Sequence, residues 1–404
     1  MDGFGSSFKK AFCTRLSKWE QMPALLLDDD EPRKFFGPSK DGPAPGDTSV
    51  PPPPQVLDGL TVADAEQLMA CIGTPQLSDA WKQGIFFAGY QPYGLQQVSG
   101  GPCGVLAVLQ AFLIRSLLER GGGNAEAVLN VDETVRHEAL LDAVCEVLFR
   151  NAGDAKQALL LMPSSANAAP LSIGQLRGLQ PVRFKAQEQL RYYISMRPYK
   201  EMLFNPSGCG LALLLYSLVY TRGTEGIRER DADDPKAAVM IGAHGYCTQE
   251  LVNLMVFGRA YTNVFDGTKR LGSAKDGWCV LQGAPRRAAI GFLSLFEAYN
   301  CIEVGSRYKC PVVPVWVVCA ESHYTVLFST EASFDPKDEQ SPVDLYYFDQ
   351  LGRQSDRIRL TVRPGQMPSH LATGFEDSES MIDRCIRTKW TRAAVDWNGT
   401  DKIL

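Results

Sequence analysis

The sequence has little of what would mark a metal, disulfide or membrane protein. Its 11 cysteines form no CxxC pair, so neither a zinc site nor a redox motif is predicted. An odd number of cysteines in a chain of 404 residues also does not suit a disulfide framework, which favours a reducing compartment. The most apolar late run, Pro311–Ala320, is too short to cross a membrane and contains two prolines. We therefore expect no cofactor, no metal, no membrane segment and no secretory signal.

The sequence also has no large excess of charge of either sign. The 41 basic and 46 acidic residues give a net charge of −5, so the charge balance indicates no nucleic acid partner. The hydrophobic content of 45% is enough for one large domain or two smaller ones. We expect a monomer in the cytoplasm, and the sequence leaves the nucleus open as a second location.

The first part of the chain lacks the apolar residues that a core needs. From about Leu27 to Pro54 it is acidic and then rich in glycine, proline and serine, which predicts a linker with polyproline II character at its end. The amphipathic piece Phe8–Leu26 is interpreted either as a partner-binding helix or as a frayed tail. We predict a weakly structured tail and linker over 1–56 and one folded domain over 57–404.

Within that domain, helical patterns come first and strand patterns last. Helices are expected over 63–69, 103–120, 132–152, 187–196 and 211–219. Two polar stretches, Ser164–Asn167 and Arg228–Pro235, are expected to be surface loops, the second a solvated run of charges. Four β-branched and aromatic runs, 314–319, 323–328, 344–348 and 357–362, predict an antiparallel meander. This order indicates the α+β class.

One stretch has the character of a nucleophile site. Gly100 and Gly101 allow a tight turn, Pro102 suits the first turn of a helix, and Cys103 follows directly. A thiol at a helix N-terminus is favoured as the thiolate by the helix dipole and the unpaired N–H groups. The alternative is that Cys103 is a small buried hydrophobic residue at the start of a core helix.

A nucleophilic cysteine needs a base, and the chain has only four histidines. His137 lies in a polar helical stretch and His370 in an irregular one, so both are expected at the surface. His244 lies in a turn, where a structural hydrogen bond is the simpler role. His323 opens a strand of the expected sheet, and it is the candidate base.

Two further residues complete the expected site. Asp349 follows the strand over 344–348 and would reach the imidazole if that strand neighbours the strand of His323; alternatively it is an ordinary turn residue. Gln97, upstream of the cysteine, could donate an amide N–H to an oxyanion together with the backbone N–H of Cys103. From the residues alone, this arrangement indicates a thiol hydrolase or an acyl transferase.

The same stretches resemble a known family. The segment from Gln97 to Ala107 is similar to the nucleophile segment of the MINDY deubiquitinases, and Glu321–Leu327 is similar to their histidine strand. Gly242–Leu254, Ile290–Glu297 and Cys385–Trp390 resemble the branch with the longer catalytic domain. The similarity extends from about Ser78 to Leu404.

This resemblance implies a papain-like cysteine peptidase fold, in which the central helix that carries the nucleophile packs on an antiparallel β-sheet with helical insertions. It implies hydrolysis of isopeptide bonds in ubiquitin chains, preferentially lysine-48-linked ones, with ubiquitin and polyubiquitin as partners. The resemblance implies that Cys103 is the nucleophile, His323 the base and Gln97 the oxyanion donor. The role of Asp349 as the group that orients the imidazole is inferred from the strand pattern alone. A catalytically silent ubiquitin-binding protein and a hydrolase for another ubiquitin-like modifier are the alternatives.

Overall fold

The computed structural model describes residues 50–122, 124–153, 156–163, 173–273, 277–331, 334–367 and 379–402. These residues fall into two compact units. The first, which we call the helical unit, contains the described residues up to Tyr261 together with Gln350–Ser355. The second, the sheet unit, contains Thr262–Asp349 and the described residues from Asp356 onward.

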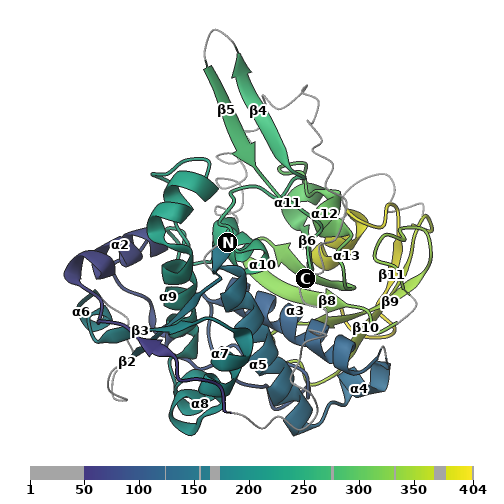
Figure 1. Cartoon of the computed structure of the whole chain (residues 1–404). Helices are drawn as coiled ribbons and strands as arrows, with labels where there is room; N and C mark the ends of the chain where they lie inside the picture. The colour runs from purple at the N-terminus through teal and green to yellow at the C-terminus, as the bar shows by residue number, and fades with distance from the viewer. Residues whose placement is uncertain are drawn as a thin grey trace. The chain divides into compact units, whose positions relative to one another are not determined.

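The helical unit consists mainly of helices, with one small sheet (Figure 1). In chain order its described elements are β1 (Gln55–Val56), α2 (Val62–Ile72), η1 (Asp79–Trp81), α3 (Cys103–Arg120), α4 (Ala125–Leu129), α5 (Glu133–Arg150), β2 (Ala158–Pro163), α6 (Ile173–Leu176), β3 (Leu179–Phe184), α7 (Gln187–Ser195), α8 (Arg197–Phe204), α9 (Gly210–Arg222), the π-helical turn η3 (Gly226–Asp231) and α10 (Gln249–Phe257). All five predicted helices are therefore confirmed.

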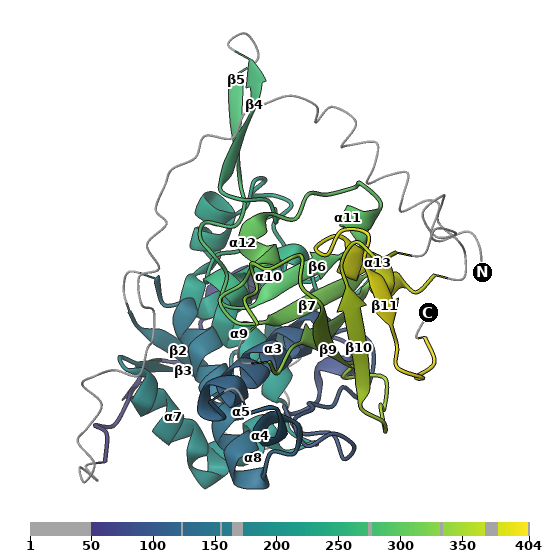
Figure 2. The ribbon, with the colours of Figure 1, turned by 90° about the vertical axis from the view of Figure 1, so that its right-hand side faces the viewer.

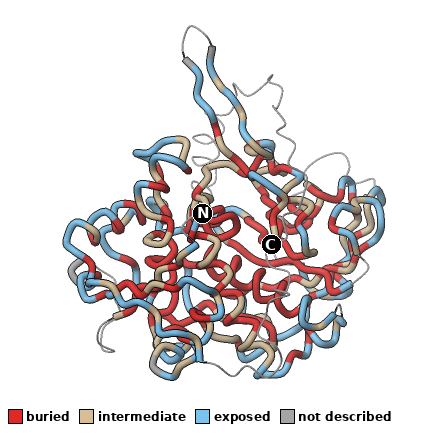
Figure 3. Tube along the Cα trace, in the orientation of Figure 1, coloured by how far each residue is buried: buried red, intermediate tan, exposed pale blue. Residues whose placement is uncertain are grey.

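Helix α3 is the centre of the helical unit and packs against α5 and α10. It is buried on every side from Cys103 to Leu117, as the apolar residues around its whole circumference predict. The polar side chain of the buried Gln110 has hydrogen-bond partners for both ends of its amide. It accepts a hydrogen bond from the backbone N–H of Leu95 at 2.7 Å and donates one to the carbonyl of Tyr93 at 2.8 Å. Figure 3 shows long buried stretches of the tube, with half-buried and exposed stretches between them.

The small sheet has the order β1-β3-β2, and both pairings are antiparallel. The sequence reading missed β2 and β3, whose short apolar runs periodicity cannot distinguish from buried helix. Strand β1 lies in the segment expected to be linker: Gln55 pairs with Arg183 and Val56 with Val182. The described part of that segment thus adds an edge strand, while residues 1–49 lie outside the described residues.

The expectation of a surface loop with a solvated charge run over Arg228–Pro235 was wrong in two respects: its first residues are helical, and Asp231 is buried, although Glu229 and Arg230 are exposed. Residues up to Asp231 belong to the π-helical turn, and the Asp231 side chain is only 2% exposed. Its carboxylate accepts two hydrogen bonds from the buried Arg222 guanidinium, at 2.5 and 2.7 Å, and one from the backbone N–H of Ala260. Pairing of this kind makes it possible to bury a charge. The other predicted loop, Ser164–Asn167, lies outside the described residues.

The sheet unit is built on a six-stranded sheet of order β11-β10-β9-β8-β7-β6 (Figure 2). Its described elements are β4 (Thr268–Ser273), β5 (Gly277–Gln282), β6 (Gly291–Ser294), α11 (Leu295–Ala298), α12 (Ser306–Lys309), β7 (Val315–Ala320), β8 (His323–Phe328), β9 (Val343–Phe348), β10 (Ile358–Arg363), α13 (Met381–Arg387) and β11 (Ala394–Asp396). The predicted meander is confirmed as β7 to β10, each antiparallel to the next. The parallel strand β6 and the short strand β11 were not predicted.

Apolar side chains of this sheet form a core with helix α13. Trp316 of β7 and Trp390, which follows α13, meet edge to face with ring centroids 5.4 Å apart. Ile382 and Ile386 of α13 belong to the same buried cluster. Strand β8, which carries His323, is therefore an inner strand of a sheet supported by packed side chains.

The α+β prediction fits this mixture of helices and mainly antiparallel strands. Among the described residues, no helix is both long and apolar enough to span a bilayer.

Candidate active site

Cys103 is the first residue of α3, as the sequence predicts, but Pro102 is the N-cap and not the first helical residue. Pro102 has φ −83° and gives the helix no side-chain cap. The turn before it depends on Gly101, whose φ of +131° is a backbone conformation that side chains with a Cβ rarely adopt. The Cys103 side chain is thereby fixed at the start of a buried helix, and the residue is 2% exposed.

The carbonyl oxygen of Gly101 lies between two thiols. It is 4.0 Å from Sγ of Cys103 and 3.5 Å from Sγ of Cys247, which precedes helix α10. Sequence reasoning missed Cys247 as part of this region, although it lies in the Gly242–Leu254 stretch that was singled out. The two cysteines are separated by 143 residues of sequence, so no spacing signal could have paired them.

Gln97 is buried in the same unit and is 1% exposed. Its side-chain Nε2 donates to the carbonyl of Ser99 at 2.8 Å, while its buried Oε1 has no hydrogen-bond partner in the described part of the chain. Its backbone N–H donates to the carbonyl of Gln350 at 2.8 Å, so the Gln350–Ser355 segment is held beside it. The neighbouring Val98 N–H donates to Oε1 of Gln83 at 2.9 Å. The loop before the cysteine is therefore fixed by hydrogen bonds on both sides.

His323 and Asp349 come together in the sheet unit. His323 begins β8 after the two-residue turn Glu321–Ser322, in which Glu321 has φ +57°. Asp349 directly follows β9, and β8 pairs with β9, as in the register Val326 to Phe348. Nε2 of His323 lies 2.9 Å from Oδ1 of Asp349, and their side chains are 32% and 14% exposed. The neighbouring strands that the sequence argument required are thus present.

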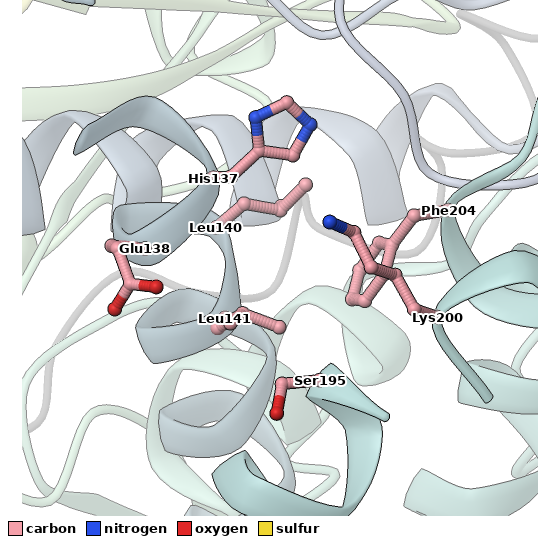
Figure 4. A pocket seen from close by; sticks show the side chains of 7 residues that line it. All are labelled: His137, Glu138, Leu140, Leu141, Ser195, Lys200 and Phe204. Carbon is pink, nitrogen blue, oxygen red and sulfur yellow. The ribbon is translucent and has the colours of Figure 1, made fainter. Parts of the chain in front are cut away.

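The other histidines in the described residues do not have a carboxylate contact like that of His323 with Asp349. His137 of α5 contacts the backbone carbonyl of Glu133 through Nδ1 at 2.7 Å and the Phe87 ring edge to face. It is half-buried and lines a cavity of about 90 Å³ (Figure 4), smaller than the ~300 Å³ or more of typical small-molecule sites. His244 lies in a turn, as expected, and is exposed; its expected structural hydrogen bond stays a prediction. His370 lies outside the described residues.

Several buried thiols are kept protonated by their surroundings. Burial raises the pKa of Cys209 to about 11 and that of Cys71 to about 11 as well. Burial also raises the pKa of Cys145 and Cys385 well above the ordinary value. No group of three or more metal-ligating side chains occurs in the residues that the structure describes.

Comparisons with known proteins point the same way. Residues 71–399 match the family described as "Deubiquitinating enzyme MINDY-3/4, conserved domain". The chain is 40% identical over 350 residues to a "Probable ubiquitin carboxyl-terminal hydrolase MINDY-4" of Xenopus tropicalis, which covers 81% of this chain and 44% of that protein. For the human protein of the same description the identity is 38% over 324 residues, 77% of this chain and 41% of that one.

A second group of relatives is more distant. The chain is 30% identical over 303 residues to the human "Ubiquitin carboxyl-terminal hydrolase MINDY-3", covering 68% of this chain and 66% of that protein. The chain spans less than half the length of the MINDY-4 relatives given above. No solved structure matches the chain significantly. Since the family match covers most of the sequence and confirms the resemblance, this protein belongs to the MINDY-3/4 family of deubiquitinating enzymes.

Proposed function

We propose that the chain is a cysteine-type ubiquitinyl hydrolase that cleaves isopeptide bonds in ubiquitin chains, preferentially lysine-48-linked ones. The observation that carries the proposal is the Cys103 thiol at the N-terminus of a buried helix. Membership of the MINDY-3/4 family and the curated relatives, described as ubiquitin carboxyl-terminal hydrolases, support the substrate. We further propose a papain-like fold and a monomer that acts in the cytoplasm, with the nucleus a second location.

In the proposed mechanism His323 takes the proton of the Cys103 thiol, and the thiolate attacks the isopeptide carbonyl carbon, so that a carbon–sulfur bond forms as the carbonyl double bond opens. The resulting oxyanion accepts hydrogen bonds from the Cys103 N–H and the Gln97 side-chain amide. The carbon–nitrogen bond then breaks as His323 gives a proton to the departing lysine amine. Water, deprotonated by His323, hydrolyses the thioester and releases a ubiquitin carboxylate and the free thiol.

Asp349 would orient the base. Its carboxylate contacts Nε2 of His323, so Nδ1 is the ring nitrogen through which we propose that the proton is exchanged. Gln350, the next residue along the chain, accepts a hydrogen bond from the backbone of Gln97. The His323–Asp349 contact supports the proposed roles of these two residues as base and orienting group.

One observation favours a different function. Cys103 is only 2% exposed, which suits a catalytically silent ubiquitin-binding protein better than an open nucleophile. A hydrolase for another ubiquitin-like modifier would use the same residues. We prefer the ubiquitin hydrolase, because active sites often reach their working geometry only when substrate binds.

The test is cleavage of lysine-48-linked di-ubiquitin by the wild type, Cys103→Ala and the control Cys145→Ala, whose thiol is buried in α5. We expect cleavage by the wild type and the control and none by Cys103→Ala, with all three folded by circular dichroism. Full activity in Cys103→Ala would disprove the assignment. Lysine-63-linked di-ubiquitin tests the linkage preference, and electrophilic probes built on ubiquitin and on other modifiers separate the three functions.

A further inference from the structure

The N-terminus of α3 lacks the usual cap. The first N–H groups of a helix have no partner within it, and a side-chain oxygen of the N-cap residue commonly accepts from them. Here the N-cap is Pro102, whose side chain has no acceptor. Another group must therefore satisfy these donors in a region as buried as this one.

The thiol of Cys247 faces this helix end. Its Sγ lies 3.5 Å from the Gly101 carbonyl oxygen, to which the thiol donates. The pKa of the Cys247 thiol is raised to about 12, chiefly by burial and next by a charge on Cys103, while hydrogen bonds from backbone N–H groups, those of Val105 and Gly104 among them, lower it in part. The Cys247 thiol thus remains neutral, with a donor contact on one side and helix N–H groups on the other.

Cys247 is itself held rigidly. It closes a turn by bridging to Ile241, and Gly242 N–H donates to the Tyr246 carbonyl at 2.9 Å within that turn. The backbone N–H of Ile241 donates to the carbonyl of Ile72, the last residue of α2, at 2.8 Å. A Cβ placed on Gly101 would stand 3.7 Å from the Gly245 carbonyl oxygen, so the turn lies directly beside the glycine turn.

We infer that Cys247 is a positioning residue for the nucleophile, in which the thiol replaces the missing N-cap of α3: it accepts from Gly104 and Val105 and donates to Gly101. This rests on the proposed function, in which Cys103 is the nucleophile. The contact fixes both the glycine turn and the first helical turn, between which the Cys103 backbone lies. It also gives a role to the Gly242–Leu254 stretch, which the proposed mechanism does not use.

The kinetic test uses three substitutions that separate hydrogen bonding from packing. Cys247→Ser keeps a donor and an acceptor, whereas Cys247→Ala and Cys247→Val keep neither. We expect both apolar variants to lower kcat by on the order of tenfold to 100-fold with KM unchanged, because a small misplacement of a reacting group is that costly. Cys247→Ser should restore most of kcat. The substrate is a fluorogenic amide of the ubiquitin C-terminus.

Cys71 is the matched control, because it is a buried thiol of the same unit, in α2. Cys71→Ala and Cys71→Ser should leave kcat near the wild-type value. Wild-type kcat in Cys247→Ala would overturn the inference. So would a higher kcat in Cys247→Val than in Cys247→Ser, because the residue would then act only by packing.

A second measurement does not depend on activity. Hydrogen–deuterium exchange of a peptide over Cys103–Leu106 should be faster in Cys247→Ala than in the wild type and near wild type in Cys247→Ser. Equal exchange in all three proteins would overturn the capping role. If the wild type hydrolyses no ubiquitin substrate, the proposed function fails, and the exchange experiment still decides whether Cys247 caps α3.

Discussion

Nε2 of His323 lies 2.9 Å from Oδ1 of Asp349, across two neighbouring antiparallel strands. The imidazole is thereby held by one ring nitrogen, which fixes both its tautomer and the direction of Nδ1. A contact of this type orients a catalytic base in enzymes that use a nucleophile and histidine pair.

The first prediction concerns this contact. Asp349→Ala should lower kcat by roughly 100-fold to 10,000-fold, the usual contribution of a positioned acid or base. Asp349→Asn should be milder, because its amide oxygen still accepts from Nε2–H. Steady-state kinetics on lysine-48-linked di-ubiquitin measures both. Asp344→Ala in the same strand is the control, since Asp344 contacts the Thr361 hydroxyl and not the histidine. Equal rates in Asp349→Ala and the control would remove Asp349 from the site.

The second prediction concerns Gln97. Gln97→Ala should reduce kcat by roughly 100-fold to 1000-fold with little change in KM, because an oxyanion donor acts mainly once charge develops. The backbone hydrogen bond to Gln350 is retained in this variant. Gln96→Ala is the matched control, because the Gln96 side chain donates to the carbonyls of Gln97 at 2.7 Å and of Gln350 at 3.1 Å, so its loss tests support of this loop without removing the Gln97 amide. A change below about threefold in Gln97→Ala would mean that Gln97 is an ordinary loop residue.

The third prediction concerns the N-terminal boundary. Deleting residues 1–49 should leave the melting temperature nearly unchanged, because that segment is predicted to be a weakly structured tail and linker. Deleting residues 1–60 should lower it by several degrees, since it removes β1, the buried Leu60 and the hydrogen bond from Gln189 to the Pro52 carbonyl. Differential scanning fluorimetry of the two truncations compares them directly. Identical melting temperatures would show that residues 50–60 add nothing to stability.

The fourth prediction is a pH dependence that arises in the ion pairs of α5. Burial raises the pKa of Glu146, but the charges of Arg150 and Arg115 and hydrogen bonds from both lower it more, so its net pKa lies below the ordinary 4.5. A depressed carboxyl pKa stabilises the folded state above the unfolded pKa, and this contribution is lost as the pH falls through the folded value. Glu146→Gln should therefore cost about 3 kcal/mol at pH 7 and less below about pH 4.

Urea unfolding at pH 7 and at pH 3.5 measures this difference. Glu119→Gln is the control, because Glu119 also pairs with Arg115 but its side chain is 56% exposed, so we expect an effect below about 1 kcal/mol. A destabilisation by Glu146→Gln that is the same at both pH values would contradict the electrostatic origin.

Much of the fold could be predicted because its signals are local. The start of α3 at Cys103 follows from two glycines and a proline before an apolar run, and the strands over 315–363 follow from β-branched and aromatic residues between turns. What the sequence did not predict depends on distant partners. Strand β6 exists through parallel pairing with β7, and Asp231 is buried because Arg222 pairs with it.

The residues of the site also divide into those with a local sequence signal and those that depend on distant partners. Cys103 and His323 are marked by their local settings, and the contact of Asp349 with His323 needed only the neighbouring order of two strands. Cys247 could not be associated with the nucleophile, because no periodicity relates a turn before α10 to the start of α3. The unpartnered Oε1 of Gln97 is likewise a property of packing and not of sequence.

The exposed thiol of Cys279, on strand β5, has a practical consequence for covalent chemistry. It is the only exposed cysteine among the ten in the described part of the chain. A small alkylating reagent will therefore modify this strand readily, and the stoichiometry of labelling will report access to solvent, not nucleophilic power. A background with Cys279→Ser and Cys310→Ser removes the exposed and the half-buried thiol of the described residues, and peptide mapping then tells whether an adduct lies on the thiol at the start of α3.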